Sequence, residues 1–171
     1  MMNNNQATFE NLVHAYSAEL YRFAFWQCKN KELAEDMLQE CFTRAWKALH
    51  KLEDEKAARA WLYTILRREI ARHFGRKSSD ELSLDELDIE LLGAQYDCKV
   101  ADEINLRQAV NKIPHDYRDA LMLQVLGGYS CDEIADMTGT KSGTIMTRVF
   151  RARQKLRQLL TNESKSSAKL Q

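Results

Sequence analysis

The sequence has little of what would break helices or cross-link the chain. One proline and six glycines among 171 residues interrupt few positions. Four scattered cysteines, with no close pair, argue against a disulfide framework and a cysteine zinc site. No apolar run approaches the roughly 20 residues that cross a bilayer, and the polar start at residues 1–8 does not resemble a secretion signal. We therefore expect a helical, cytoplasmic protein.

Arrangements typical of catalytic or metal sites are also missing. The histidines are dispersed, and Glu69 with His73 makes only one pair at helical spacing, which cannot complete a metal site. A carboxylate-metal enzyme would need Glu-x-x-His pairs, and the sequence has none. We therefore expect no metal, no cofactor, no small-molecule substrate and no enzyme activity.

Positive and negative side chains are equal in number over the whole chain but are strongly segregated along it. The formal net charge is zero, yet residues 1–77 carry a net +3, residues 78–103 a net −8 and residues 104–171 a net +5. Two basic regions joined by an acidic connector suit a protein that binds DNA at two places while its connector stays off the phosphates. A merely solvated spacer is the alternative.

Helical periodicity divides the chain into two groups of helices. We expect helices near 7–28, 30–49 and 57–75, then a connector at 78–103, then helices near 104–112 and 116–126. Leu121, Leu123, Val125 and Leu126 are expected to bury the last of these against a helix-turn-helix. The predicted fold is all-α, with one domain at 7–77, an acidic linker at 78–103, a second domain at 104–161 that contains the helix-turn-helix, and a polar tail at 162–171.

The helix-turn-helix is predicted from residues 127–160. Ser130 and Glu133 have the spacing of a capping box, and Gly139 suits the left-handed residue that ends a helix. A second, basic helix comes after Ser142 and gathers its apolar residues on one face, namely Ile145, Val149, Ala152, Leu156 and Leu159. Its other side offers threonine and arginine, which can read bases in the major groove. A solvated basic surface helix is the alternative.

The helix at 57–75 presents a second candidate nucleic-acid surface. Leu62, Ile65, Leu66 and Ile70 fall toward one side, whereas Trp61 and several arginines project from the other side or its edge. An aromatic ring beside guanidinium groups can stack unpaired bases and hold the backbone. The alternative places Trp61 in the core.

Two separated blocks of the sequence resemble the extracytoplasmic-function sigma factors, the compact two-domain specificity subunits of bacterial RNA polymerase. One block covers residues 34–46 and 61–65, and the other covers motifs between residues 113 and 153. The resemblance implies that the first domain binds the polymerase clamp and the minus-ten element, and that the second binds the minus-thirty-five element. The implied function is recognition and melting of promoter DNA for transcription initiation, as in stress responses.

The resemblance also implies roles for particular residues. The clamp-binding motif matches Asp36, Gln39, Glu40 and Phe42, and Phe42 has internal packing as its alternative. The minus-ten segment matches Trp61, Arg67, Arg68, Arg72 and Arg76, preceded by a loop at 51–58 that would capture a flipped base. The minus-thirty-five set is Lys141, Thr144, Met146, Thr147, Arg148 and Arg151. Many relatives have Asn and Asp where this chain has Arg68 and Arg72, and Lys where it has Met146, so a promoter sequence cannot be transferred.

The implied partners are core RNA polymerase, promoter DNA and an anti-sigma factor, which could hold the protein at the membrane, away from the nucleoid. The main rival is a stand-alone helix-turn-helix regulator, which would bind an operator tightly without polymerase. A helical adaptor without DNA contact is less consistent with the basic second helix.

Overall fold

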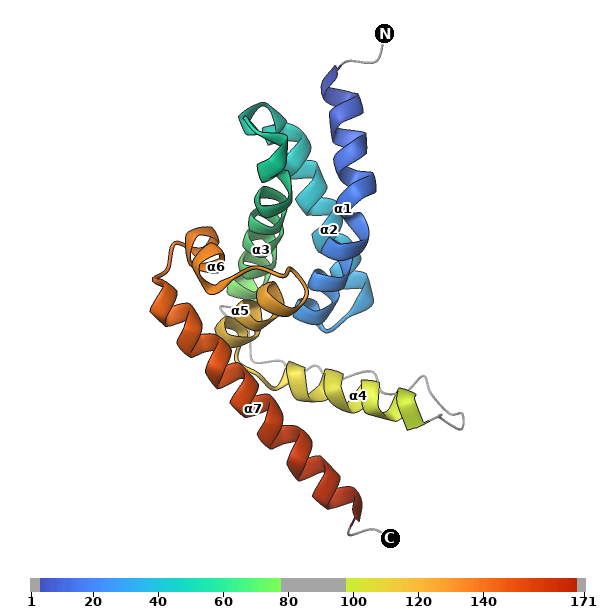
Figure 1. Ribbon diagram of the computed structural model, residues 1–171. Coiled ribbons are helices and arrows are strands. Elements are labelled where there is room, and N and C mark those ends of the chain that lie inside the picture. The colour runs from blue at the N-terminus through green and yellow to red at the C-terminus, as the bar shows by residue number, and fades with distance from the viewer. Residues whose placement is uncertain (1–3, 78–97, 169–171) are drawn as a thin grey trace.

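The computed structural model describes the backbone of residues 4–77 and 98–168 and the side chains of residues 5–75 and 103–162. Within these ranges the chain forms helices and no strand. The first unit holds α1 (Asn4–Cys28), α2 (Lys31–Ala48), the short 3-10 helices η1 (Leu49–Lys51) and η2 (Glu55–Ala57), and α3 (Ala58–Lys77). The second holds α4 (Cys98–Asn111), α5 (His115–Val125), α6 (Cys131–Thr138) and α7 (Ser142–Ala168) (Figure 1). The predicted all-α fold of two helical units is confirmed.

A tight reversal sets α2 against α1. Lys29 adopts a left-handed conformation with φ of 63°. The side-chain oxygen of Asn30 then accepts a hydrogen bond from the Leu33 amide at 3.0 Å, which caps α2. The two helices consequently pack along each other, and α3 packs against both.

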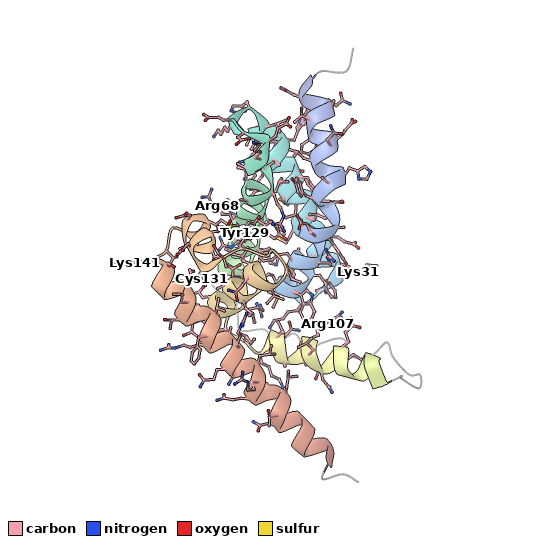
Figure 2. The ribbon with its side chains drawn as sticks, viewed as in Figure 1. Lys31, Arg68, Arg107, Tyr129, Cys131 and Lys141 are labelled. Atoms are coloured by element: carbon pink, nitrogen blue, oxygen red, sulfur yellow. The ribbon has the colours of Figure 1, made fainter. Side chains whose placement is uncertain are left out.

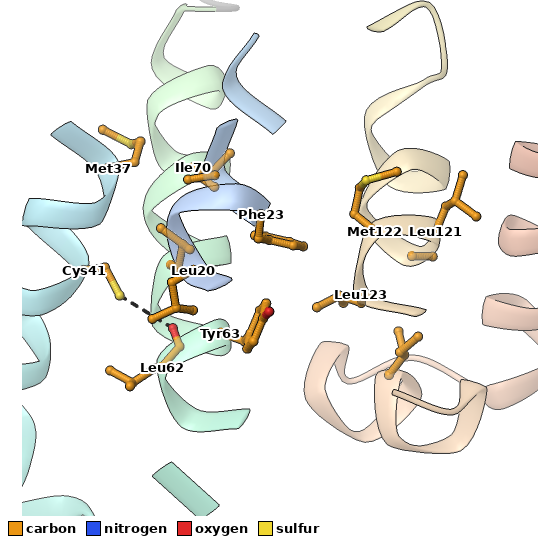
Figure 3. Close-up of a cluster of buried hydrophobic side chains, with 14 of the residues drawn as sticks. Leu20, Phe23, Met37, Cys41, Leu62, Tyr63, Ile70, Leu121, Met122 and Leu123 are labelled. Atoms are coloured by element: carbon orange, nitrogen blue, oxygen red, sulfur yellow. Dashed lines mark hydrogen bonds between the residues drawn. The ribbon is translucent and has the colours of Figure 1, made fainter. Parts of the chain in front are cut away.

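The core of the first unit lies where these three helices meet (Figure 3). Its largest fully buried hydrophobic side chains are Leu20 and Phe23 of α1, Cys41 of α2, and Leu62, Tyr63, Leu66 and Ile70 of α3. The Cys41 thiol donates to the Leu62 carbonyl oxygen at 3.6 Å, which ties α2 to α3. Trp46 of α2 is 47% exposed.

In the second unit, α5 packs on α7, and α6 packs on both. The inner face of α7 is buried through Ile145, Val149 and Ala152, as predicted. Val125 is 58% exposed, so its expected burial is wrong. The reason is helical geometry: at about 100° per residue, alternate positions such as Leu123 and Val125 do not share a face.

Two boundaries differ from the sequence prediction. Helix α4 begins at Cys98, so residues 98–103 of the expected connector are helical, whereas residues 78–97 lie outside the described part. Helix α7 continues to Ala168, into the expected polar tail. Neither segment contains glycine or proline, so nothing in it stops a helix that has already formed.

The two units lie directly against each other, with α5 beside α1 and α6 beside α3 (Figure 1). Buried hydrophobic residues of both units belong to one cluster. The sequence predicts two bodies joined by a linker and does not anticipate this shared contact. Among the described residues, no helix is both long enough and apolar enough to cross a membrane.

Candidate nucleic-acid interface

The helix-turn-helix of α6 and α7 is held by local hydrogen bonds. The Ser130 hydroxyl accepts from the Glu133 amide at 3.2 Å, and the Glu133 carboxylate accepts from the Ser130 amide at 2.7 Å. These two bonds form the predicted capping box. Because the Ser130 amide bonds to the charged carboxylate, the pKa of Glu133 is lowered.

The turn between the two helices fixes the start of α7. Gly139 has a φ of 63° and closes α6 in the left-handed conformation, as predicted. The Ser142 hydroxyl then bonds to the carboxylate of Asp132, which links the first turn of α7 to α6. The amino-terminal turn of α7 is therefore fixed against α6.

The outward side of α7 carries the residues predicted for the upstream promoter element. Five of the six are exposed, namely Lys141, Thr144, Met146, Thr147 and Arg151, and Figure 2 shows Lys141 at the amino-terminal end of the helix. Arg148 is partly buried because it lies along α5, with its guanidinium 3.7 Å from the Asp116 carboxylate. Arg151 donates to the Tyr117 hydroxyl at 3.2 Å. The structure brings the whole predicted set onto one end of one helix.

The arginines of α3 have different surroundings. Arg67 forms an ion pair with Asp119 of α5, and its Nε donates to both carboxylate oxygens at 2.8 and 3.0 Å. Arg72 donates to the buried carboxylate of Glu69 at 2.8 Å. Arg68 is exposed and lies on α3 (Figure 2). The side chain of Arg76 falls outside the described residues, and Trp61 packs partly buried against the core.

Asp119 is the centre of a polar contact between the two units that the sequence reasoning missed. Besides Arg67, it accepts from the Gln27 side chain of α1 at 3.3 Å. The Gln27 oxygen in turn accepts from the Nε of Arg118 at 3.1 Å. Gln27, Arg118 and Asp119 are all buried, and burial lowers the pKa of Arg118. The available signal was the adjacent charged pair Arg118 and Asp119, which directly precedes the apolar run 120–123.

A second contact joins the units through aromatic rings. The guanidinium of Arg59 lies 5.5 Å from the ring centre of Tyr63 and 4.9 Å from that of Tyr129. Glu19 holds Arg59 in place with two hydrogen bonds, at 2.8 and 2.9 Å. The two rings meet edge to face at 5.6 Å. Tyr129 of the helix-turn-helix unit is therefore fixed on the surface of α3.

The predicted polymerase-binding residues lie on α2. Asp36, Gln39 and Glu40 are exposed and form an acidic outer surface. Phe42 is partly buried, and its ring meets that of Phe9 of α1 edge to face, with 6.2 Å between the ring centres. Part of its side chain therefore packs internally, as the alternative interpretation expects.

The cysteines that the structure describes are free thiols, two of them buried. Burial raises the pKa of both Cys28 and Cys41 to about 12, so both remain protonated at neutral pH. Among the described residues, no group of three or more His, Cys, Asp or Glu side chains could hold a metal ion.

These features define a class: an all-helical protein of two units, in which a helix-turn-helix presents a basic outer face. Residues 12–79 match the family described as Sigma-70 region 2, and residues 103–156 match Sigma-70 region 4. The RNA polymerase sigma factor SigV of Bacillus subtilis is 30% identical over 161 residues, which cover 94% of this chain and 96% of SigV. The chain belongs to the extracytoplasmic-function (ECF) RNA polymerase sigma factor family.

Other relatives agree in sequence and in fold. The ECF RNA polymerase sigma factor EcfG of Rhodopseudomonas palustris is 32% identical over 142 residues, covering 82% of this chain and 78% of EcfG. The sigma factor RpoE, solved with the anti-sigma factor NepR from Bartonella quintana, superposes with a TM-score of 0.74 at 31% identity. That match covers 90% of this chain and 96% of RpoE.

Proposed function

We propose that this protein is an alternative specificity subunit of bacterial RNA polymerase, which directs initiation by recognising promoter DNA and helping to melt it. The observation that carries the proposal is the joint match of both units to sigma regions, with the region 4 match containing a helix-turn-helix whose basic face is open. The sigma factor family is not an enzyme family.

Within this function, α7 would read the upstream duplex element. Its outward arginines and threonines suit hydrogen bonds to base edges and phosphates in the major groove. The capping box of α6 and the amino-terminal end of α5 support the helix, so the proposed reading surface exists before DNA binds. Lys141 would contact phosphate at the start of the helix.

The α3 surface would engage the melted minus-ten element through Trp61, Arg67, Arg68, Arg72 and Arg76, with residues 51–58 capturing a flipped base. Arg68 is exposed for this role. Arg67 is engaged with Asp119 in the present arrangement, so its use on DNA requires the two units to part. Mounting both units on polymerase would supply that separation and make two weak contacts act together.

The acidic surface of α2, with Asp36, Gln39, Glu40 and Phe42, would bind the polymerase clamp. Its exposed carboxylates suit a basic partner surface. An anti-sigma factor is the other proposed partner, because RpoE and the more distant CnrH were solved with NepR and with the cytosolic domain of CnrY. We place the protein in the cytoplasm, on the nucleoid when active, with a membrane-bound anti-sigma factor as a means of restraint.

The test is transcription with purified core polymerase on promoters recovered by genomic selection. Initiation above core polymerase alone supports the proposal, and its absence on every recovered promoter contradicts it. Tight, specific binding of an operator by the protein without polymerase would instead favour the stand-alone regulator.

A further inference from the structure

A buried cation at the contact between the two units is bonded to neutral groups. Arg118 is 4% exposed, and its Nε donates to the Gln27 side chain at 3.1 Å. Its Nη1 donates to the Asn111 carbonyl oxygen at 3.4 Å, and its Nη2 donates to the Gln27 carbonyl oxygen at 3.5 Å. The neighbouring carboxylate of Asp119 binds Arg67 and Gln27 instead. Burial therefore lowers the pKa of Arg118, because its charge has lost water without gaining a directly bonded anion.

Lys29 adds another positive charge at the edge of this contact. It directly follows α1, two residues after Gln27, and its φ of 63° turns the chain there. Its side chain is exposed, yet partial burial and the charge of Arg118 both lower its pKa. Lys29, Arg67 and Arg118 thus gather beside the carboxylate of Asp119. The contact is held by hydrogen bonds and one ion pair while its surplus of positive charge opposes it.

The repulsion acts only while the units touch. Lys29 belongs to the first unit and Arg118 to the second, so parting the units separates the two charges and exposes both to water. Water screens such charges far better than the contact does. A charge that is unfavourable in the closed arrangement and nearly neutral in the open one shifts the equilibrium toward opening.

We propose that Lys29 is a built-in electrostatic opponent of closure, which sets how readily the two units part. Loss of its positive charge then favours the closed arrangement, in which Arg67 is held by Asp119. Closure concerns the protein alone, whether or not it acts in transcription.

Two native thiols allow opening to be measured. Cys28 is 4% exposed, and the charge of Arg118 lowers the pKa of its thiol against the larger effect of burial, so the second unit lies close to it. Cys41 is buried within the first unit, where its thiol donates to the Leu62 carbonyl oxygen. Opening of the contact should therefore expose Cys28 and leave Cys41 covered.

The test is the rate at which N-ethylmaleimide labels each thiol in the full chain, resolved by mass spectrometry. When opening and closing are fast, this rate follows the fraction of open protein. We expect Lys29→Gln to slow labelling of Cys28 about twofold to fivefold relative to Cys41. Lys29→Arg keeps the charge and should label at the unaltered rate. Lys31→Gln, the same change at an exposed lysine of α2, is the matched control and should also label at the unaltered rate.

A second background separates closure from a direct effect of the Lys29 charge on the adjacent thiol. Asp119→Ala weakens the contact, so labelling of Cys28 should be faster and Lys29→Gln should slow it much less. Slowing of equal size in both backgrounds would assign the effect to thiol reactivity and overturn the proposal. Unchanged or faster labelling in Lys29→Gln alone would also overturn it, and so would equal slowing in Lys29→Arg. Each of these results would leave the proposed function standing, because none of them involves polymerase or DNA.

Discussion

The two candidate DNA-binding surfaces of this protein are prepared in opposite ways. On α7 the predicted residues stand on the outer side of a supported helix, and five of the six are exposed. On α3 two arginines are bound to carboxylates, Arg72 to Glu69 within the helix and Arg67 to Asp119 of the other unit. The proposed duplex-reading surface is thus open in this structure, whereas the proposed minus-ten surface is partly occupied by carboxylates of the protein itself.

This arrangement would keep the two proposed nucleic-acid sites from acting independently. Asp119 occupies Arg67 with the same kind of charge that a phosphate would bring. The two arrangements exclude each other, so Arg67 becomes available to a phosphate only when the units separate, whereas Arg72 stays paired with Glu69 within α3. Free protein should therefore bind melted promoter DNA poorly.

Asp119→Ala should destabilise the contact between the two units more than any other single substitution. It leaves Arg67 without its carboxylate partner and removes the acceptor for Gln27 at the interface between the units. Breaking a buried ion pair of this kind costs about 3 kcal/mol of unfolding free energy, and the units should spend more time apart. Denaturant unfolding measures the stability, and small-angle X-ray scattering measures the expected increase in radius of gyration.

A matched control is Asp116→Ala on the same helix. Its carboxylate is 70% exposed and lies 3.7 Å from Arg148, so its removal should change the unfolding free energy by under about 0.5 kcal/mol. If Asp119→Ala lowered the unfolding free energy as little as Asp116→Ala, the contact of Asp119 with Arg67 would not hold the units together.

Arg151→Ala should affect DNA and leave the fold unchanged, in contrast to any change at Arg67. Arg151 is exposed, and its hydrogen bond to Tyr117 is also exposed. Loss of a base contact costs on the order of 1 to 3 kcal/mol at a matched upstream site, measured by competition binding of the holoenzyme. Lys155→Ala, by comparison, should weaken all sequences evenly and reduce the dependence on salt. Unchanged promoter preference in Arg151→Ala would exclude it from base reading.

Tyr129→Leu tests the aromatic half of the contact between the units. It removes one ring from the guanidinium of Arg59 and the edge-to-face contact with Tyr63. We expect the unfolding free energy to fall by about 1 to 2 kcal/mol, with a modest rise in radius of gyration. Tyr129→Phe keeps both ring contacts and should resemble the unaltered protein. Equal losses in the two variants would assign the effect to the hydroxyl.

The sequence predicts the parts of the molecule whose determinants are local. Ser130, Glu133 and Gly139 lie within ten residues and define the helix-turn-helix by capping and turn chemistry alone. The ion pair of Arg72 with Glu69 joins residues three positions apart on one helix. Such a pair can be predicted from the sequence, because residues at this spacing are neighbours on a helix surface.

The pairing of Arg67 with Asp119 could not be predicted in the same way. The residues are 52 positions apart, and their meeting depends on how α5 docks on the first unit. Helix periodicity places Arg67 on the polar side of α3 but does not say whether solvent, DNA or another helix covers that side. Trp61 raises the same difficulty. It packs partly against the core, and its contact with a base stays a prediction.

A small, pH-dependent effect on stability is expected at the capping box of α6, which supports α7. The carboxylate of Glu133 is stabilised by the Ser130 amide, so its pKa in the folded protein lies below the unfolded value. A lowered carboxyl pKa contributes stability above the unfolded pKa of about 4.5, and this contribution is lost as pH falls through the folded pKa. Glu133→Gln should therefore unfold at slightly lower denaturant than the unaltered protein at pH 7, and the gap should close at pH values below the folded pKa. A gap that stays constant with pH would show that the charge of Glu133 does not contribute.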